Sequence, residues 1–411
     1  MTDTFAQYLA NYADLAVQVG VNVQPGQVFV IRAPVETAPL VRLMAASAYR
    51  CGAKLVDVMW GDDALTLARF QHADRDSFAA YPTWRADGLL KIAEEGGAFL
   101  SVQASDPDLL KGQDPDLIAK AQQTANEHQA GYRDYVMRDA VNWCVISVPI
   151  QAWANRVFPN TPSESREEKL WDAIFDVCRL KEADPVAAWR THIQYLAHRS
   201  DYLNQKKYQA LKLTNANTDL TVGLPDNHIW KGGQSTTQSG IDFVPNLPTD
   251  EVFTMPHKDR VDGVVRSSKP LNYGGAVIED FTLTFEKGKI VKATAKKEEA
   301  TLHRLLDIDE GARRLGEIAL VPTSAPVSQS GLLFYNTLFD ENAASHLALG
   351  RAYRFTLQEG TAMSDNEFAN CGGNTSLTHV DFMVGSDDMD IDAITKSGDV
   401  EPLMRSGEWV D

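Results

Sequence analysis

A histidine and an aspartate stand two positions apart in the apolar stretch 377–384 (LTHVDFMV). Successive side chains of a strand point to opposite faces, so His379 and Asp381 would share one face while Val380 and Phe382 occupy the other. An imidazole and a carboxylate in this arrangement suit a borderline divalent cation such as Zn²⁺, Co²⁺ or Mn²⁺. The alternative is a surface hydrogen bond between the two side chains. The pair therefore indicates a metal site only if further donors accompany it.

Two glutamates in the same half of the chain have apolar neighbours. Glu251 opens the run 251–256 (EVFTMP) and would share a strand face with Phe253, and Glu317 lies within 316–321 (GEIALV). A carboxylate embedded in an apolar strand costs several kcal/mol unless it is neutralised or bound to a cation. Each glutamate is therefore either a metal ligand or a carboxylate at a strand end that reaches solvent.

A further histidine and a tyrosine lie between these segments. His346 falls in 342–350 (NAASHLALG), whose small residues and terminal glycine predict a helix with a glycine at its C-terminal end. Tyr353 begins the run 353–357 (YRFTL), which we expect to be extended. A histidine on a helix or an aromatic residue at a strand start is usually a packing residue, so neither position indicates chemistry by itself.

Taken together, these donors match a pair of divalent cations. Three carboxylates and two imidazoles carry a charge of −3 against the +4 of two such ions, which leaves room for hydroxide. One carboxylate would have to bridge the two ions. The hypothesis requires five side chains, distant along the chain, to converge in one pocket: Glu251, Glu317, His346, His379 and Asp381.

The elements that position these residues fall into two parts. In the first part, short apolar runs alternate with helical stretches such as 36–51 and 116–139, which predicts a mostly parallel sheet covered by helices on both faces. A helical segment over 163–208 follows. The turn-rich connection 214–219 and the hairpin signal at 286–289 then indicate a mainly β region with a few helices. The apolar runs are 28–31, 55–60, 98–102 and 143–148.

We therefore expect two domains in the 411 residues. Residues 1–205 should form an α/β domain with a helical extension. Residues 206–411 should form a mainly β (α+β) domain that holds the metals and carries out catalysis.

Composition excludes several classes of protein. The net charge of −17 argues against a nucleic-acid partner, because no surface that neutralises phosphates is implied. The four cysteines are widely scattered, which fits a reducing compartment and provides neither a zinc ribbon nor a disulfide framework. Neither a secretory signal nor an apolar run of the ~18 residues that span a bilayer is visible. We expect a cytoplasmic protein that does not enter a membrane.

Common enzyme motifs are missing from the sequence. No histidine is followed by glutamate, so the H-E-x-x-H zinc helix is absent. The chain also lacks G-x-x-x-x-G-K-[ST], a G-x-G-x-x-G after its first strand, and a G-x-S-x-G elbow. These absences argue against a nucleotide-binding enzyme and against a serine hydrolase.

Long blocks around the candidate donors carry a resemblance to a known family. They are 244–254 (VPNLPTDEVFT), 313–322 (RRLGEIALVP), 334–348 (FYNTLFDENAASHLA) and 374–383 (NTSLTHVDFM), with 22–27 (NVQPGQ) and 168–175 (EKLWDAIF) in the first part. By these blocks the chain resembles, over essentially its whole length, the M29 metallo-aminopeptidases of the aminopeptidase T and aminopeptidase S group.

The resemblance implies roles for particular residues. Glu251, Glu317, His346, His379 and Asp381 fall on the family's metal-binding positions. Tyr353 falls on a tyrosine close to the metals, which acts either as a ligand or as a catalytic hydroxyl. The resemblance also implies a homodimer whose active site faces an enclosed cavity that admits short peptides.

The expected function is a metal-dependent aminopeptidase that hydrolyses the N-terminal residue from short peptides with a free N-terminus. Two divalent ions (Zn, Co, Mn or Mg) would activate a bridging water. Glu317 or Glu251 would move its proton, and Tyr353 would hydrogen-bond the oxyanion. Two alternatives remain: another dinuclear metallohydrolase, such as a phosphoesterase or amidase, and a non-catalytic nucleotide- or peptide-binding protein built on the parallel sheet.

Overall fold

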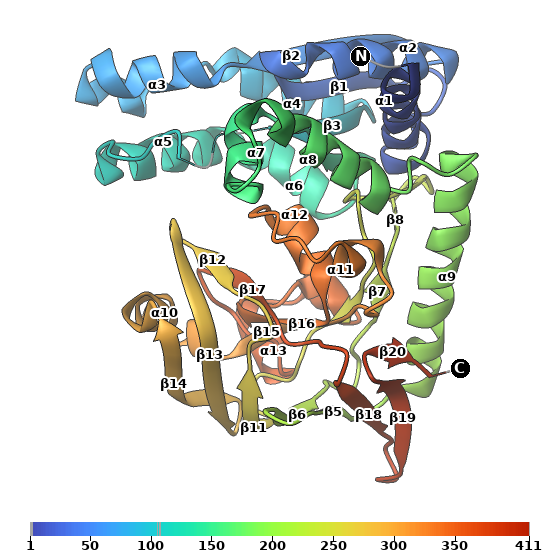
Figure 1. Ribbon diagram of the computed structural model, residues 1–411, viewed down its shortest axis with the longest axis vertical. Coiled ribbons are helices and arrows are strands. Elements are labelled where there is room, and N and C mark those ends of the chain that lie inside the picture. Colours follow the sequence, from blue (N-terminus) through green and yellow to red (C-terminus); the bar gives the residue numbers. More distant parts are fainter. Residues whose placement is uncertain (1–2, 105, 107, 411) are drawn as a thin grey trace. The chain divides into compact units, whose positions relative to one another are not determined.

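Parallel strands in the first half of the chain and antiparallel strands in the second half define two units in the computed structural model, which describes residues 3–104, 106 and 108–410 (Figure 1). Unit 1 comprises Met1–His192 and Gln234–Pro248. Unit 2 comprises Ile193–Gly233 and Thr249–Asp411. The fold is thus α/β in its N-terminal part and mainly β in its C-terminal part, as predicted.

A parallel sheet with strand order β2-β1-β3-β4 organises unit 1. The strands β1, β3 and β4 are short, apolar and mostly buried because helices cover them, whereas the edge strand β2 is more exposed. Helix α2 packs on β1 and β2. Helices α4 and α6 pack through Leu89 and Tyr132 against Val30 and Phe99. The elements are β1 (Val28–Pro34), β2 (Leu55–Gly61), β3 (Ala98–Gln103), β4 (Trp143–Ser147), α2 (Ala38–Arg50), α4 (Thr83–Glu94) and α6 (Ala130–Met137).

The predicted helix over 116–139 is present as α5 and α6. The Asp114 side chain accepts a hydrogen bond from the Asp116 amide, and Pro115 occupies the first position of α5. The long helical segment after β4 is divided into separate helices. The remaining helices of this part are α1 (Asp3–Leu15), α3 (Asp63–His72), α5 (Pro115–His128), α7 (Gln151–Val157), α8 (Ser163–Val177) and α9 (Pro185–Lys206), and a short hairpin joins β8 (Ser235–Thr236) to β9 (Asp242–Phe243).

Two antiparallel sheets build unit 2. The short sheet has the strand order β17-β16-β15-β10-β7, and the long sheet has the order β12-β13-β11-β6-β5-β18-β19-β20, with β14 paired to β13. The short sheet consists of β7 (Lys231–Gly232), β10 (Val252–Thr254), β15 (Leu315–Leu320), β16 (His346–Gly350) and β17 (His379–Met383). The predicted hairpins at 214–219 and 286–289 are present as β5–β6 and β13–β14.

The long sheet runs through most of the sequence of unit 2, and helices flank both sheets (Figure 1). Its strands are β5 (Ala210–Thr214), β6 (Asp219–Gly223), β11 (Val261–Arg266), β12 (Leu271–Tyr273), β13 (Ala276–Glu286), β14 (Lys289–Lys297), β18 (Asp390–Ile394), β19 (Val400–Arg405) and β20 (Glu408–Trp409). The helices are α10 (Glu299–Leu306), α11 (Pro326–Ser330), α12 (Thr337–Asp340) and α13 (Asp365–Asn370).

One hydrophobic core joins the two sheets of unit 2. Ile318, Leu347 and Phe382 of the short sheet are buried in the same cluster as Leu213 and Phe281 of the long sheet. Because side chains alternate along a strand, the residues next to these three in the short sheet point away from the core. The opposite face of the short sheet is therefore available for polar side chains.

Two local predictions are wrong. His346 lies at the start of β16, not on a helix, because the run His346–Gly350 pairs with β15 on one side and β17 on the other. Small residues suit a strand with both faces covered, and tertiary pairing overrides their helix propensity. Tyr353 precedes a 3₁₀ turn, Arg354–Thr356, where we expected a strand, since the Thr356 hydroxyl donates to the Tyr353 carbonyl at 2.6 Å.

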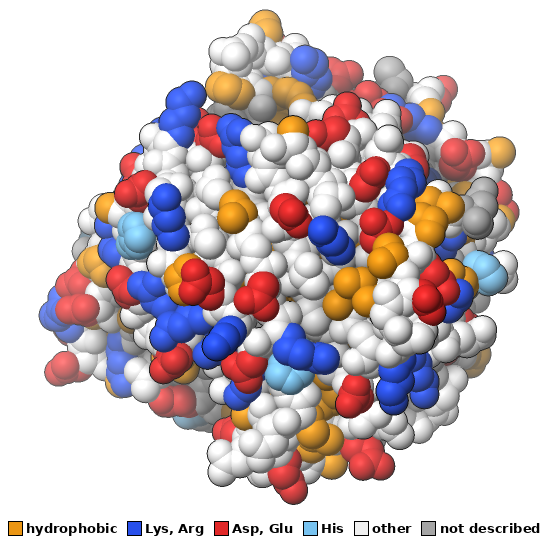
Figure 2. Space-filling model, turned by 90° about the horizontal axis from the view of Figure 1, so that it is seen from below, with side chains coloured by type: hydrophobic (Ala, Val, Ile, Leu, Met, Phe, Trp, Pro, Cys, Tyr) orange, Lys and Arg blue, Asp and Glu red, His pale blue; other side chains and the backbone are white. Residues whose placement is uncertain are grey.

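The surface carries charges of both signs. On the face of the molecule in Figure 2, acidic and basic side chains are interspersed. Within the described residues, no helix combines the length and apolarity needed to cross a membrane.

Gly316 should be intolerant of any side chain. It lies where the register between β15 and β16 shifts, and a Cβ built there would lie 2.3 Å from the Arg351 carbonyl oxygen and 2.4 Å from that of Gly350. Backbone atoms cannot move aside cheaply, so Gly316→Ala should lower the free energy of unfolding of unit 2 by about 2–3 kcal/mol, as measured by chemical denaturation.

Gly88→Ala is the matched control. Gly88 lies in α4 with no atom within 4 Å of a built Cβ, so this change should raise stability by about 0.5–1 kcal/mol. Equal effects of the two substitutions would contradict the close approach at Gly316.

Candidate metal centre

The short sheet presents the candidate donors on the face opposite the core. Across its strands, Glu317 pairs with Ala348, and Ala348 pairs with Asp381. One row away, Ala319 pairs with His346. Strand alternation therefore places Glu317, His346 and Asp381 on the same face of three neighbouring strands.

Small residues separate the donors within this face. Ala348, fully buried, stands between Glu317 and Asp381 in the register, and Gly350 stands opposite His379. A methyl group or a hydrogen at these positions leaves the space above the sheet to the longer donor side chains. The apolar composition of β16 thus serves the core on one face and provides room for the donors on the other.

Glu251, Glu317 and His346 form the first group of donors. His346 Nε2 lies 3.2 Å from Glu251 Oε2 and 3.6 Å from Glu317 Oε1. Glu251 precedes β10 directly and points to the same side as Phe253. One ligand atom from each of the three residues lies within 4.8 Å of the others, which is close enough to hold one metal ion.

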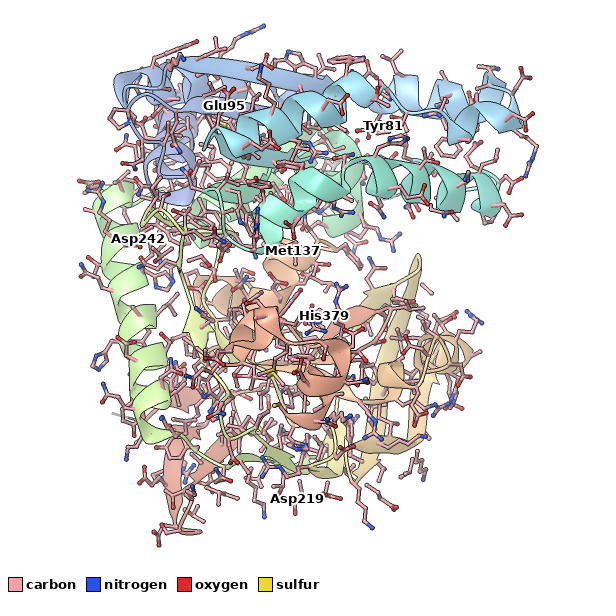
Figure 3. The ribbon with its side chains drawn as sticks, turned by 180° about the vertical axis from the view of Figure 1, so that it is seen from behind. Tyr81, Glu95, Met137, Asp219, Asp242 and His379 are labelled. Atoms are coloured by element: carbon pink, nitrogen blue, oxygen red, sulfur yellow. The ribbon has the colours of Figure 1, made fainter. Side chains whose placement is uncertain are left out.

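Glu317, His379 and Asp381 form the second group. His379 Nε2 lies 3.8 Å from Glu317 Oε2 and 3.4 Å from Asp381 Oδ1, and these donor atoms also lie within 4.8 Å of one another. Figure 3 shows His379 across unit 2 from Asp219. Glu317 belongs to both groups and turns one carboxylate oxygen toward each imidazole. The structure thus brings together all five residues that the sequence singled out as candidate ligands.

Backbone carbonyls orient both imidazoles. His346 Nδ1 lies 3.1 Å from the Ala344 carbonyl, and His379 Nδ1 lies 2.6 Å from the Arg351 carbonyl. A carbonyl only accepts, so Nδ1 carries the hydrogen and donates it. In the neutral ring Nε2 then presents its lone pair to the carboxylates, which is the tautomer that a metal ligand requires.

Burial and mutual repulsion distort the pKa values of the carboxylates. Desolvation, together with the charges of Asp381 and Glu251, raises the pKa of Glu317 to about 7 despite its contact with His346. Burial also acts on Asp381, but the neighbouring His379 imidazole holds its pKa below the usual value. The buried site therefore does not hold all of its carboxylates ionised without positive charge beside them.

The imidazoles supply that positive charge in the protein alone. Burial disfavours the charged form of His379, yet the contacts with Asp381 and Glu317 outweigh it and raise its pKa to about 9. The same balance, with Glu251 and Glu317 as partners, raises the pKa of His346 well above its ordinary value. Without metal, the protonated histidines offset the negative charge of the carboxylates, as bound cations would do.

The residues present fit divalent cations. Two buried oxygens, Glu251 Oε2 and Asp381 Oδ1, accept no hydrogen bond from any described residue, and each belongs to a donor group. An orphaned buried oxygen costs free energy unless a cation or water satisfies it. Carboxylate oxygens with imidazole nitrogens are ligands that Zn²⁺, Co²⁺ and Mn²⁺ accept.

The sequence analysis missed Glu341. Burial, followed by the charges of Glu251 and Asp381, raises the pKa of its side chain well above the usual value. It lies in the 3₁₀ turn Glu341–Ala343, just before the segment that leads to His346. In the sequence, the polar run Asp340–Asn342 is indistinguishable from a solvated turn, and only the structure shows that it turns inward.

Tyr353 stands beside the second donor group. Its ring centroid lies 4.6 Å from that of His379, and the ring also stacks with Phe355 at 5.2 Å. Burial and the charge of Glu317 raise the pKa of its hydroxyl, so that the phenol stays protonated and able to donate a hydrogen bond.

A buried asparagine links the segments that carry Glu251 and Glu341. The Asn342 side-chain oxygen accepts the Asp250 amide at 2.7 Å, and its amide group donates to the Leu338 carbonyl at 3.1 Å. Asn342 is fully buried, so these bonds are shielded from water. Its side chain therefore fixes the position of the 250–251 segment relative to the 3₁₀ turn.

Comparisons with known proteins extend over nearly the whole chain. A sequence model of the family described as thermophilic metalloprotease (M29) matches residues 5–409. "Aminopeptidase 2" of Geobacillus stearothermophilus is 53% identical over 401 residues, which cover 98% of this chain and 97% of that protein. "Aminopeptidase T" of Thermus thermophilus is 44% identical over 408 residues, which cover 99% of this chain and 100% of that protein.

Solved structures show the same likeness. The structure of wild-type AmpT from Thermus thermophilus superposes with a TM-score of 0.92 at 43% identity, covering 99% of this chain and 100% of that chain. A 2,5-dihydroxypyridine dioxygenase from Pseudomonas putida KT2440 matches with a TM-score of 0.51 at 12% identity, which indicates a shared fold alone. By the extent of the sequence match and the identity of its relatives, this chain is a member of the thermophilic metalloprotease (M29) family.

Proposed function

We propose that this protein is a metal-dependent aminopeptidase that removes the N-terminal residue from short peptides with a free N-terminus. The observation that carries the proposal is the pair of donor groups, Glu251–Glu317–His346 and Glu317–His379–Asp381, which share one buried carboxylate. Membership of a metalloprotease family and relatives named aminopeptidases support the reaction class.

The donor set favours two divalent cations over one. Each group offers three side chains, and Glu317 is the residue able to serve both ions at once. Two ions would carry +4 against the −4 of Glu251, Glu317, Glu341 and Asp381, so two bound cations offset the whole charge of these four carboxylates when all are ionised. Zn²⁺, Co²⁺, Mn²⁺ and Mg²⁺ are the candidate metals. When bound, they supply Lewis-acid polarisation of the scissile carbonyl and acidify water toward neutral pH.

Glu341 is the best candidate for the general base and acid. A carboxylate that moves the proton from water to the leaving amine needs a raised pKa and a place beside the ligands. Glu251 and Glu317, the candidates from the sequence, already belong to the donor groups. Glu341 belongs to neither group, yet its pKa is raised by the charges of Glu251 and Asp381. It can therefore take up the proton without leaving a metal.

Tyr353 would stabilise the oxyanion of the tetrahedral intermediate. Its hydroxyl remains protonated because burial disfavours the phenolate, and its ring is held by contacts with Phe355 and His379. A fixed donor pointing at the charge that develops in the reaction costs no reorganisation when the reaction occurs.

The acidic site also explains why an exopeptidase would result. A free α-amino group brings a lone pair that a bound cation would accept. Acylation removes that lone pair, so a blocked N-terminus or an internal peptide bond loses this interaction.

The proposal extends to the domains, the oligomeric state and the cellular location of the protein. All proposed ligands lie in 206–411, which supports a catalytic domain there and an α/β domain in 1–205. We infer a homodimer from the family membership, which sedimentation velocity tests. The four cysteines form no disulfide in the structure, which supports a reducing, cytoplasmic setting that fractionation of cells tests.

Substrate tests separate this function from its rivals. The metal-loaded protein should hydrolyse Leu-p-nitroanilide and unblocked peptides, and lose at least about 100-fold in kcat/KM on their N-acetylated forms, because the free amino group is part of the recognition. Turnover of p-nitrophenyl phosphate with no peptidase activity would instead identify a phosphoesterase. Binding of peptides without turnover or metal would identify a non-catalytic binding protein.

Removal of single donors should reveal which ions they hold. His346→Ala and His379→Ala should each lose about one cation, measured by elemental analysis, because each belongs to a single donor group. Glu317→Ala should lose both, since it belongs to both groups, and each variant should lose peptidase activity with little change in fold.

Glu310→Gln serves as the control for these variants. Glu310 is exposed and pairs only with Lys289, so its replacement should leave metal content and activity unchanged. Full activity of metal-stripped His379→Ala or Glu317→Ala protein would refute the assignment of the donors.

Glu341→Gln should separate proton transfer from metal binding. The glutamine keeps the shape of the side chain but cannot take up a proton, so kcat should fall by about 10²- to 10⁴-fold while two cations remain bound. Steady-state kinetics and metal analysis of the same sample provide both measurements. Loss of metal from this variant would show that Glu341 is a ligand, and undiminished kcat would exclude it as the base.

A further inference from the structure

An exposed arginine stands next to the acidic site. Arg351 directly follows β16, and hydrogen bonds fix its backbone on both sides. Its amide donates to the Thr378 carbonyl at 2.7 Å, and its carbonyl accepts Nδ1 of His379 at 2.6 Å. The backbone of Arg351 is thus attached to the ring of a proposed metal ligand.

The side chain of Arg351 lacks the ion pair that several other arginines of unit 2 form. Arg314, Arg354 and Arg405 each form an ion pair, with Asp259, Asp365 and Asp392 respectively. Arg351 is exposed and forms no ion pair with any residue that the structure describes. An unpaired guanidinium has its planar set of N–H donors free for a ligand.

The position of its backbone keeps the Arg351 side chain beside the second donor group. Its carbonyl is bonded to the His379 ring, and Nε2 of that ring lies 3.4 Å from Asp381 Oδ1. Tyr353, whose ring centroid lies 4.6 Å from that of His379, follows two residues later. An exposed cationic side chain thus begins next to the acidic site and forms no ion pair with a carboxylate that the structure describes.

We infer that Arg351 binds the C-terminal carboxylate of the peptide substrate and so gives the enzyme a preference for short peptides with a free C-terminus. The inference rests on the proposed function. In a dipeptide the carboxylate lies one residue beyond the scissile bond, and each further residue moves it by up to ~3.5 Å. Arginine matches a carboxylate with two parallel hydrogen bonds, which an amide or ester cannot reproduce.

The geometry distinguishes this role from a structural one. Only the backbone of Arg351 takes part in orienting His379, and any residue at this position supplies the same carbonyl. Replacement of the side chain therefore leaves the His379 hydrogen bond intact. A change in substrate preference after this replacement would therefore be caused by the loss of the guanidinium group.

A matched set of substrates tests the inference on the metal-loaded full chain. The set is Leu-Phe, its C-terminal amide, and Leu-p-nitroanilide, which has no carboxylate. Wild-type protein should prefer the free acid over the amide. Arg351→Gln should lower kcat/KM for the acid by about fivefold to tenfold, mainly through KM, while the amide and the anilide change by less than about twofold.

Further variants and a longer peptide sharpen the result. Arg351→Lys should keep part of the preference, and Arg351→Glu should reverse it in favour of the amide. Arg304→Gln is the control, because Arg304 is exposed on α10 away from the short sheet and should not affect the acid-to-amide ratio. For a five-residue peptide the acid and the amide should be cleaved equally, since the carboxylate then lies beyond Arg351.

The outcomes distinguish this inference from the proposed function. Equal losses on all three substrates in Arg351→Gln, or an unchanged acid-to-amide ratio, would overturn the role of Arg351 while leaving the aminopeptidase intact. Absence of turnover on every substrate would overturn the aminopeptidase. In that case calorimetry can measure how tightly the protein binds an uncleavable reduced-amide analogue of Leu-Phe, as the acid and as the amide. Tighter binding of the acid, lost in Arg351→Gln, would show that Arg351 binds the carboxylate.

Discussion

Negative charge buried on one face of the short sheet is the constraint on which the rest of unit 2 depends. Glu251, Glu317, Glu341 and Asp381 lie within mutual influence, and the pKa values of Glu317 and Glu341 are raised by burial and by their neighbours. A protein does not retain such a cluster for stability, since apolar replacements of similar volume would cost less. Protons on the histidines and glutamates relieve the repulsion in the absence of cations. Divalent cations relieve it as well, and they also supply catalytic chemistry. Protons and cations compete for the same lone pairs of the histidines and carboxylates.

A strand has two faces, and the short sheet uses them for opposite purposes. Leu347 and Phe382 bury apolar surface against the long sheet, while His346 and Asp381, their neighbours in sequence, point the other way. The rigid packing of one face therefore fixes the geometry of the other. Donors on paired strands keep their separations because the register cannot slip by one residue without exposing the core. The site also requires a small residue at Ala348, because a larger side chain between Glu317 and Asp381 would fill the space that their oxygens need.

Sequence reasoning succeeded where one strand carries its own signal. The alternation in 377–384 placed His379 and Asp381 on one face, and the apolar neighbours of Glu317 made a buried ligand one of its two interpretations, the one that its burial in the structure matches. It failed where the signal is tertiary. Nothing local in 342–350 distinguishes a central strand from a helix, so the pattern gave the wrong element for His346. Glu341 escaped notice for a related reason, because its burial depends on Asn342 and on segments far away in the sequence.

The arrangement of strands does not by itself decide the function. The parallel sheet of unit 1 would suit a nucleotide-binding protein, and a structure named as a dioxygenase shares the fold at low identity. One fold supports different reactions, so the reaction has to be argued from the side chains at the site. Here that argument starts from Glu317, whose carboxylate faces both His346 and His379. An ordinary ion pair needs only one partner. A buried carboxylate held between two imidazoles, each turned toward it by a backbone carbonyl, has the geometry of a ligand shared by two cations, and this arrangement favours a hydrolase over a passive binding protein.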